Sequence, residues 1–349
     1  MDERATLPVL LPWRRQPFPI DWEGAFGRRC PLTLEIGFGD GRYTVHAAKE
    51  RQDACLIGLE ISSASLQRAL RRVKREGADN VRLAKAGARF ALRHLFAEHA
   101  LERIVINFPD PWPKERHAER RLLSRDFFRL AASRLRPGGA VCLATDHAEY
   151  FAFAVEEAQA AGGFEVRETA APDAVFETKY ALKWRAQGIP LRYVEFVFAG
   201  GPTDPFPVLE RPSIMPHALL TGRMPEAAAF AKVVLPYAEG HVILHEIARS
   251  FGPSTVEDGQ AARSPEAAAD ATPAGQSAPR RWWVRASVDE PDIRQHLLVL
   301  VQQRSAEQVI VRLEPFGDPI ITPTVRGAVH AVTQWLLAAT GLRLEARNY

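Results

Sequence analysis

Three glycines at alternate positions, Gly37, Gly39 and Gly41, directly follow the apolar segment TLEI. A sharp turn from a strand into a helix favours residues without a Cβ, and the bare backbone lets a nucleotide approach closely. The GxGxG spacing differs from the GxGxxG of dinucleotide sites, because Arg42 stands where the third glycine would be. The pattern favours a small adenosyl ligand over a pyrophosphate, although a plain tight turn would explain the glycines alone.

Two glutamates flank this turn. Glu60 ends a second apolar segment, LIGLE, about 20 residues after the glycines, where an acidic side chain can accept hydrogen bonds from both ribose hydroxyls. Glu35 immediately precedes the turn, where its charge would favour an ammonium or sulfonium group. The alternative for Glu60 is a surface acid at the end of a strand.

A proline-rich loop, NFPDPWPK at residues 107–114, is the most unusual local sequence of the chain. Its prolines fix φ and remove backbone donors, so the loop can hold Asp110 and Trp112 in defined directions. Open α/β sheets bind ligands at the carboxyl ends of their strands, where this loop is expected to lie. The alternative is a structural turn with a packed tryptophan.

Basic residues crowd two segments. The sequence KERHAERR at residues 114–121 comes immediately after the proline-rich loop and could bind RNA phosphates. A solvated charged helix is the alternative there. A second group has helical spacing, and we expect it to form an ordinary exposed face; it comprises Arg68, Arg71, Arg72, Lys74 and Arg75.

The surrounding segments alternate between apolar runs and amphipathic stretches, which predicts an α/β fold with a doubly wound, Rossmann-like sheet. We expect Ser124 or a neighbour to cap a helix, PGG at 137–139 to form a turn, and the last two strands to pair antiparallel at the sheet edge. The expected strands are 32–36, 54–60, 81–85, 103–108, 140–145, 164–168 and 192–198. The expected helices are 43–50, 65–75 and 126–135.

Beyond residue 200 the pattern predicts a smaller α+β domain, so we divide the chain into domains at 1–200 and 201–349. The segment 252–280 lacks large apolar side chains over most of its length and cannot offset its ordering entropy, which predicts a flexible linker. A helix is expected between 288 and 308, and another at 324–339. The expected strands are 232–237, 241–247, 282–288, 308–313 and 343–347.

Composition excludes several classes of protein. With 349 residues, 25% charged, 46% hydrophobic and a net charge of +3, the chain is neither disordered nor fibrous. No run approaches the roughly 18 to 20 apolar residues of a membrane span. Cys30, Cys55 and Cys142 form no CxxC pair, so we expect neither a disulfide framework nor a zinc cluster, and a reducing cytoplasm fits. His241 and His245 lie in a strand-like stretch, so no metal site is expected.

Several motifs together resemble the tRNA (guanine-N7-)-methyltransferase family over residues 30–200. These are EIGFGDGR, GLE, NFPDPWPKERHAERR, PGG, ATDHAEY and TKY, of which the long loop motif is the most specific. The resemblance implies a class I methyltransferase domain at 1–200, S-adenosylmethionine as cofactor and tRNA as partner. It also implies a cytoplasmic enzyme that methylates N7 of the variable-loop guanine at position 46.

The resemblance also assigns roles to individual residues. It places Glu35, Glu60, Asp110 and the three glycines at the cofactor, and it makes Asp110 the catalytic candidate. It places the following residues on the substrate side: Lys114, Asp146, Thr178, Lys179 and Tyr180. We expect RNA phosphate contacts from Arg116, Arg120 and Arg121.

Methylation at guanine N7 needs no general base, because N7 carries a lone pair and no proton. Alignment of N7, methyl carbon and sulfur is the main requirement. A fixed carboxylate would stabilise the positive charge that the base acquires, with Asp110 the first candidate and Asp146 the second. Duplex RNA hides its base edges, so an exposed or flipped base is expected, and Trp112 or Tyr180 could stack on it.

Two positions depart from the family pattern. Gly87 stands where an acidic residue usually lies near the adenine, so that contact would come from the backbone of Ala88 or from elsewhere. Ala181 ends TKYA, where the family's TxYE has a carboxylate that helps to recognise guanine. These departures leave open a catalytically silent RNA-binding protein. The Asn-Phe-Pro-Asp loop loosely resembles the Asn-Pro-Pro-aromatic loop of amino methyltransferases, which leaves open a methyltransferase of another RNA or of an amine.

Overall fold

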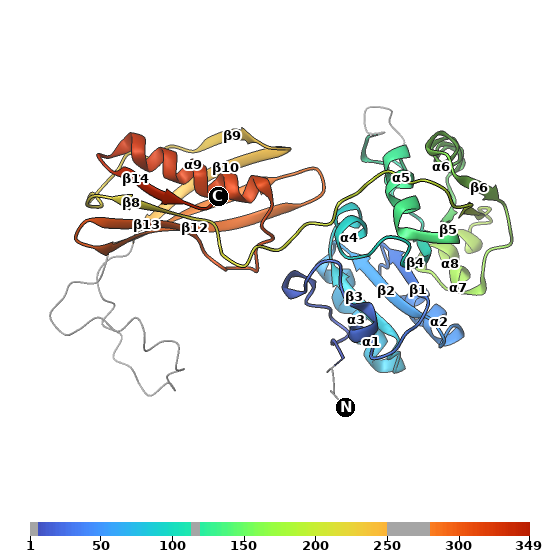
Figure 1. Cartoon of the computed structure of the whole chain (residues 1–349). Helices are drawn as coiled ribbons and strands as arrows, with labels where there is room; N and C mark the ends of the chain where they lie inside the picture. Colours follow the sequence, from blue (N-terminus) through green and yellow to red (C-terminus); the bar gives the residue numbers. More distant parts are fainter. Residues whose placement is uncertain (1–5, 113–118, 250–279) are drawn as a thin grey trace. The chain divides into compact units, whose positions relative to one another are not determined.

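The computed structural model describes residues 6–112, 119–249 and 280–349. The chain divides into two compact units, Met1–Glu210 and Arg211–Tyr349, and Figure 1 shows the elements of each. The expected linker at 252–280 lies outside the described residues except for its last residue. Each unit is described separately below.

The first unit is built on a seven-stranded sheet of order β3-β2-β1-β4-β5-β7-β6. The first five of these run parallel, while β7 is antiparallel to both β5 and β6. The Rossmann-like sheet and its antiparallel edge are therefore confirmed. The strands are β1 (Leu32–Ile36), β2 (Cys55–Glu60), β3 (Val81–Lys85), β4 (Leu101–Asn107), β5 (Leu135–Thr145), β6 (Phe164–Arg167) and β7 (Arg192–Phe198).

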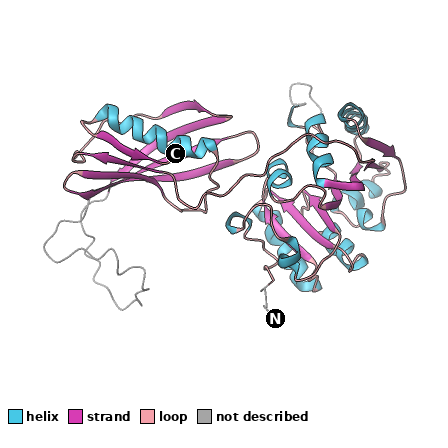
Figure 2. Ribbon diagram, viewed as in Figure 1, coloured by secondary structure: helices cyan, strands magenta, loops and turns pink. Residues whose placement is uncertain are grey.

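Helices cover both faces of this sheet, as Figure 2 shows. One face carries α2, α3 and α7, and the other carries α4, α5 and α6. Ser124 caps α5 as predicted, because its Oγ accepts a hydrogen bond from the backbone N–H of Phe127 at 3.4 Å. The helices are α1 (Trp22–Phe26), α2 (Arg42–Glu50), α3 (Ser63–Glu76), α4 (Ala88–His94), α5 (Arg125–Arg134), α6 (Ala148–Ala161), α7 (Asp173–Phe176) and α8 (Lys179–Ala186).

The expected turn at 137–139 proved wrong in its placement, because these residues lie within β5. Leu101 of β4 pairs with Leu135, but Arg103 pairs with Ala140, so β5 carries extra residues opposite β4. Gly138, with a φ of 80°, allows the backbone to bulge there without ending the strand.

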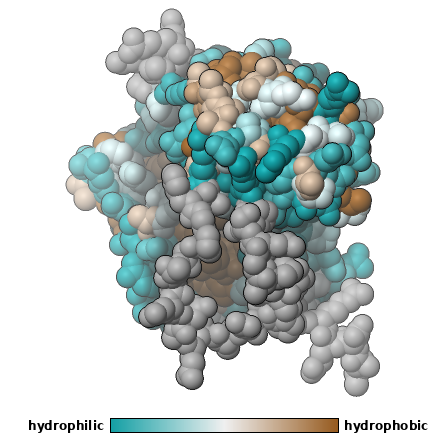
Figure 3. All heavy atoms as spheres, turned by 90° about the vertical axis from the view of Figure 1, so that its left-hand side faces the viewer, coloured by the Kyte–Doolittle hydropathy of each residue, from teal (hydrophilic) through white to brown (hydrophobic). Residues whose placement is uncertain are grey.

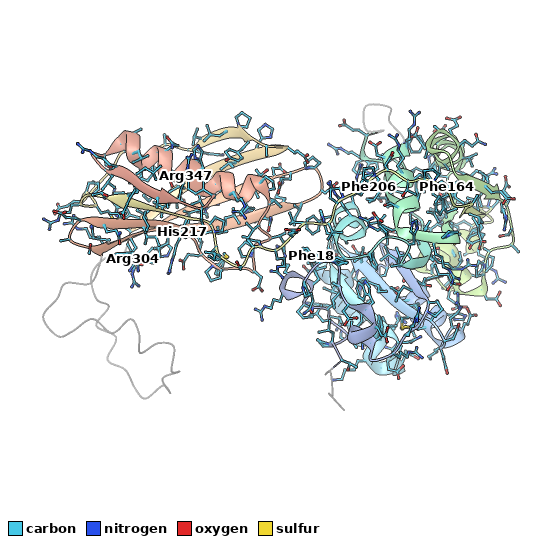
Figure 4. All side chains as sticks on the ribbon, in the orientation of Figure 1. Phe18, Phe164, Phe206, His217, Arg304 and Arg347 are labelled. Carbon is cyan, nitrogen blue, oxygen red and sulfur yellow. A yellow bond between two sulfur atoms is a disulfide. The ribbon has the colours of Figure 1, made fainter. Side chains whose placement is uncertain are left out.

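Hydrogen bonds hold two segments that lie outside the helices and strands of the first unit. The backbone N–H of Leu11 donates to the carbonyl of Leu83 at 2.8 Å, which fixes the N-terminal segment along β3. At the other end, the fully buried guanidinium of Arg134 donates to the carbonyl of Phe206, labelled in Figure 4, at 2.6 Å.

The expectation that the cysteines form no disulfide framework was wrong. Cys30 and Cys55 are joined by a disulfide, with a Cα–Cα distance of 5.8 Å. The two cysteines lie where β1 and β2 begin, at the edge of the sheet opposite the carboxyl ends of the strands. The free Cys142 is buried. Among the described residues, no helix has the length and apolar character that a membrane crossing requires.

The second unit is an antiparallel sheet of order β14-β8-β13-β12-β11-β10-β9, with the long helix α9 packed on one face. The α+β prediction is confirmed. Figure 3 views this unit from the side, and the described surface there mixes hydrophilic residues with separate apolar areas. The elements are β8 (His217–Thr221), β9 (Val233–Tyr237), β10 (Gly240–Arg249), β11 (Arg281–Asp289), β12 (Arg294–Ser305), β13 (Gln308–Leu313), α9 (Pro323–Ala339) and β14 (Arg343–Arg347).

The helix expected between 288 and 308 is wrong, because β12 occupies this segment. Its apolar run, LLVLV at 297–301, pairs with β11 on one side and β13 on the other. A strand in the middle of a sheet can be apolar on both faces, so its sequence loses the alternation that would mark it as a strand.

Candidate functional site

The glycine turn joins β1 to α2 beside the point where the strand order reverses, between β1 and β4. The φ angles are 78° at Gly37, 56° at Gly39 and 76° at Gly41, in the left-handed region that other residues avoid. A Cβ at Gly37 or Gly39 would meet nothing within 4 Å, whereas one at Gly41 would lie 2.8 Å from the Cβ of Ala69 in α3. The first two glycines therefore leave open space beside the backbone, and the third allows α3 to pack closely.

Glu60, the last residue of β2, is held by three backbone N–H groups. Its Oε2 accepts a hydrogen bond from Gly39 at 3.1 Å, and its Oε1 accepts from Ile61 at 2.8 Å and Ser62 at 2.9 Å. These bonds tie the glycine turn to the start of α3 and fix the direction of the carboxylate. A carboxylate has about four acceptor positions. A contact to both ribose hydroxyls would therefore have to share or replace one of the existing bonds.

Glu35 is a buried carboxyl group directly beneath the turn, with only 3% of its surface exposed. Burial raises the pKa of Glu35 to about 8, and the negative charges of Glu60 and Asp40 act in the same direction. The Thr44 hydroxyl donates a hydrogen bond to Oε2 at 2.5 Å, which opposes the rise in pKa. A cation bound beside this group, such as an ammonium or sulfonium, would stabilise its ionised form.

Two adjoining cavities open at the carboxyl ends of β1 and β4, with volumes of about 580 and 370 Å³. Both volumes are typical of small-molecule sites. Four residues line both cavities: Gly37, Glu60, Asn107 and Phe108. The larger cavity also contains Glu35, Tyr43, Arg42, Ser65, Arg68, Thr178, Lys179 and Tyr180. The smaller cavity also contains Ile61, Ala86, Ala88, Asp110, Trp112 and Arg120.

Asn107, the last residue of β4, forms the wall between these cavities. Both polar atoms of its amide are buried, and neither has a hydrogen-bond partner in the described part of the chain. An unsatisfied buried amide costs about 1 to 3 kcal/mol, and such groups concentrate at functional sites. Asn107 belongs to the proline-rich loop motif, but no role was predicted for it; the signal in the sequence is a polar side chain at the end of a buried strand.

The proline-rich loop leaves β4 with an unusual backbone. Phe108 and Trp112 have φ angles of 53° and 40°, which is uncommon for bulky residues and typical of functional loops. Arg121 donates to the backbone carbonyl of Pro111 at 3.2 Å and to that of Trp112 at 3.3 Å. The guanidinium of Arg120 lies 5.0 Å from the ring centroid of Trp112. Both arginines thus contact the loop itself, and their expected RNA phosphate contacts stay predictions.

The substrate-side residues 178–180 begin α8. Thr178 is the N-cap, and its Oγ1 accepts a hydrogen bond from the N–H of Ala181 at 3.1 Å. Tyr180 is 50% exposed at the larger cavity, with its ring centroid 6.1 Å from that of Phe108.

Ala181, one of the two departures from the family pattern, lies in the first turn of α8. Ala181 is the third residue of α8 and is buried, beside an apolar pocket that also involves Trp184 and Leu191. A glutamate three residues after a threonine N-cap forms a capping box, in which it bonds back to the N-cap N–H. The alanine therefore lacks one reciprocal cap bond at the start of the helix.

The remaining predicted residues lie elsewhere. Asp110 is exposed and lines the smaller cavity, on the other side of Asn107 from Tyr180. Asp146 follows β5 and is not among the described residues that line either cavity. Lys114 and Arg116 lie outside the described residues. Within the described chain, no group of three or more potential metal ligands is present.

Comparison with known proteins shows what this site belongs to. Residues 29–192 match a family described as putative methyltransferases. A tRNA (guanine-N(7)-)-methyltransferase of Thermus thermophilus is 40% identical over 330 residues, covering 95% of this chain and 96% of the relative. The chain belongs to the tRNA (guanine-N(7)-)-methyltransferase family. A family member from Deinococcus radiodurans is 39% identical over 331 residues, covering 91% and 92%, whereas one from Thermotoga maritima aligns over 182 residues, covering 51% and 58%.

The residues of this methyltransferase fit S-adenosylmethionine, the methyl donor of the reaction. The smaller cavity offers an apolar wall of Ile61, Ala86 and Ala88 for an adenine, with Glu60 beside it for the ribose. Gly87 is the N-cap of α4 and supplies no carboxylate; among the described residues, the acids that line the smaller cavity are Glu60 and Asp110. The open space at Gly37 and Gly39 and the buried Glu35 would hold the methionine portion with its positive charges.

Proposed function

We propose that this chain transfers the methyl group of S-adenosylmethionine to N7 of a guanine in tRNA, with the variable-loop position 46 as the expected target. The observation that carries the proposal is the pair of adjoining cavities. One combines an apolar wall with the carboxylate of Glu60, and the other extends from the buried Glu35 to the exposed ring of Tyr180. The cofactor would extend along the residues that both cavities share, and the base would enter the larger cavity beside Tyr180.

The chemistry asks little of the protein beyond positioning. N7 of guanine already carries a lone pair, so no side chain has to remove a proton. Bound S-adenosylmethionine supplies an electrophilic methyl group on a positively charged sulfur. The protein must align the two reactants, which can lower the barrier by several kcal/mol. It must also favour the positive charge that develops on the guanine ring.

Three observations support roles for individual residues. Tyr180 is half exposed at the mouth of the larger cavity, so its ring is available to stack on a guanine. Trp112 is covered by Arg120, which makes it the weaker candidate for stacking. Asp110 keeps an exposed carboxylate at the smaller cavity, on the cofactor side of Asn107, and its catalytic role is the prediction that the variant pair below tests. Because tRNA is the substrate, we place the enzyme in the cytoplasm.

The test is incubation of the purified protein with labelled S-adenosylmethionine and unmodified tRNA transcripts, followed by reduction and aniline cleavage. Cleavage in the variable loop would establish the acceptor, the atom and the position together. Label in RNA that resists aniline would point to another acceptor atom, and bound cofactor without any transfer would point to a silent RNA-binding protein. Either of these results would overturn the proposal.

A variant pair tests the role of Asp110. Asp110→Asn should keep most of the affinity for S-adenosylmethionine and lose most of the methyl transfer. Asp79→Asn, an exposed acid before β3 and away from both cavities, should match the unmodified protein in both measurements. Full activity of Asp110→Asn would remove this residue from the chemistry.

A further inference from the structure

Helix α3 carries a row of positive side chains on its solvent side. Its N-cap, Ser62, lies two residues after Glu60, and the helix buries Leu66, Ala69 and Val73 against the sheet. On the opposite side, Arg68, Arg71 and Lys74 are exposed at intervals of three residues, so they line one face over about 9 Å. We call these three residues the α3 stripe.

The positive charge of the α3 stripe is not balanced by neighbouring acids. Arg68 donates to the Oγ of Ser65 at 3.0 Å and Arg71 to the carbonyl of Gln67 at 3.3 Å, both within the helix. No ion pair to a described carboxylate involves any residue of the stripe.

The acids nearest to the stripe are occupied by other cations. Asp40 is paired with Arg42 at 3.1 Å and with Arg72 at 3.4 Å. Glu76 is paired with Lys49 at 2.7 Å and with Arg75 at 3.0 Å. These pairs leave the exposed face of α3 with a surplus of positive charge.

The stripe leads directly into the candidate site. Arg68 and Ser65 line the larger cavity from one side, and Lys179 and Tyr180 of α8 line it from the other. Helix α8 continues with the exposed Lys183 and Arg185. Basic side chains of both α3 and α8 therefore line the cavity that contains Tyr180, the residue proposed to stack on the base.

We propose that the α3 stripe binds the phosphates of the tRNA strand next to the nucleotide that enters the larger cavity. This inference rests on the proposed function, and it replaces the expectation from the sequence of an ordinary exposed face. Unpaired Arg and Lys side chains bind RNA mainly by releasing the counterions of the phosphates. Phosphate contacts fix the register of the nucleic acid, whereas contacts to the base specify it. The stripe would thus position the strand, and the cavity would select the guanine.

The test uses the double variant Arg71→Ala/Lys74→Ala, because these two residues lie outside the cavity linings. Dissociation constants for an unmodified tRNA transcript are measured at several salt concentrations, with S-adenosylhomocysteine present. At about 0.1 M salt the affinity should fall about tenfold, and the slope of log K against log salt should decrease by about 1.5, for two lost phosphate contacts. The affinity for S-adenosylmethionine and the unfolding temperature should not change.

A charge-matched control is Arg223→Ala/Arg304→Ala, two exposed arginines of the second unit, of which Arg304 is labelled in Figure 4. This control should retain both the affinity for tRNA and its salt dependence. An unchanged slope in the α3 variant, or an equal loss in the control, would overturn the proposal. Binding is measured without turnover, so a wild-type protein that binds tRNA but forms no 7-methylguanosine would contradict the proposed function and leave this result standing.

Discussion

The buried carboxyl of Glu35 should make both folding and cofactor binding depend on pH, and Glu35→Gln isolates the effect. Folding raises the pKa of Glu35 from its ordinary 4.5 to about 8 because burial disfavours the charged form. The folded protein therefore holds a proton that the unfolded chain releases above pH 4.5. Stability should fall as pH rises from 4.5 to 8, and a neutral glutamine should remove this loss.

The size of the effect follows from the shift. Each pKa unit corresponds to about 1.4 kcal/mol, so the full loss would be about 5 kcal/mol at pH 8 and above, and about 3 kcal/mol at pH 7. The Thr44 hydroxyl can donate to the glutamine oxygen as it does to the carboxyl. Relative to the unmodified protein, Glu35→Gln should thus gain stability steadily between pH 5 and 8.

Urea unfolding at a series of pH values measures this difference directly. Glu156→Gln, an exposed position in α6, is the matched control and should show a difference that does not vary with pH. Calorimetric titration with S-adenosylmethionine gives a second readout. If binding requires the ionised carboxylate, affinity should rise by up to about 50-fold from pH 6 to pH 8 in the unmodified protein, and much less in Glu35→Gln.

Two results would refute this reasoning. A stability difference that is constant between pH 5 and 8.5 would mean that the carboxyl titrates normally despite its burial. A cofactor affinity with the same pH dependence in both proteins would mean that Glu35 does not face the positive charge of the ligand.

Three further predictions concern the turn and the loop. Gly41→Ala should destabilise the fold by about 2 kcal/mol or more, because its Cβ would collide with Ala69. Gly37→Ala should cost only the strain of its φ angle, about 1 to 2 kcal/mol, but it should weaken S-adenosylmethionine binding. Urea unfolding measures the loss of stability in each variant, and calorimetry measures the loss of cofactor affinity. Asn107→Leu should gain stability through loss of an unsatisfied amide and still lower the rate of methyl transfer; unchanged methyl transfer would contradict a functional role for this amide. Arg121→Gln should increase hydrogen exchange of the loop amides near Trp112; unchanged exchange would show that these hydrogen bonds do not hold the loop.

The parallel sheet was predictable because its strands carry their signal locally. The segments around Glu35 and Glu60 are short, continuously apolar runs that end in turn or cap residues, and the strand bounds were correct to within one or two residues. The same kind of run at 297–301 was misread as part of a helix, because length and turn signals did not separate the two there. An apolar run therefore predicted the correct type of element only where turn or cap residues also showed where the element ends.

The contacts within the site were less predictable, because they depend on residues far apart in the sequence. The motif placed Glu60 near the glycine turn, but only the structure shows that three N–H groups already bond to it. Arg121 was read as part of a basic stretch, yet it contacts the loop ten residues earlier. The Cys30–Cys55 pairing needed the alignment of β1 with β2, which the spacing of the cysteines does not reveal.

The antiparallel end of the sheet has a consequence for how the specificity of such an enzyme can change. Strand β6 ends and β7 begins at the same edge of the sheet where β5 ends, since Arg167 pairs with Glu195 and Arg192 pairs with Thr145. Everything between them, including α7 and α8, is an insertion between two neighbouring strand ends. Within this insertion, Ala174 and Val175 of α7 are buried in the core of the sheet, whereas α8 presents the exposed Tyr180 and Lys183. Under the proposed function, Tyr180 on α8 contacts the acceptor and the turns after β1 and β2 bind the donor, so α8 is the segment to exchange between relatives when a new nucleotide target is sought.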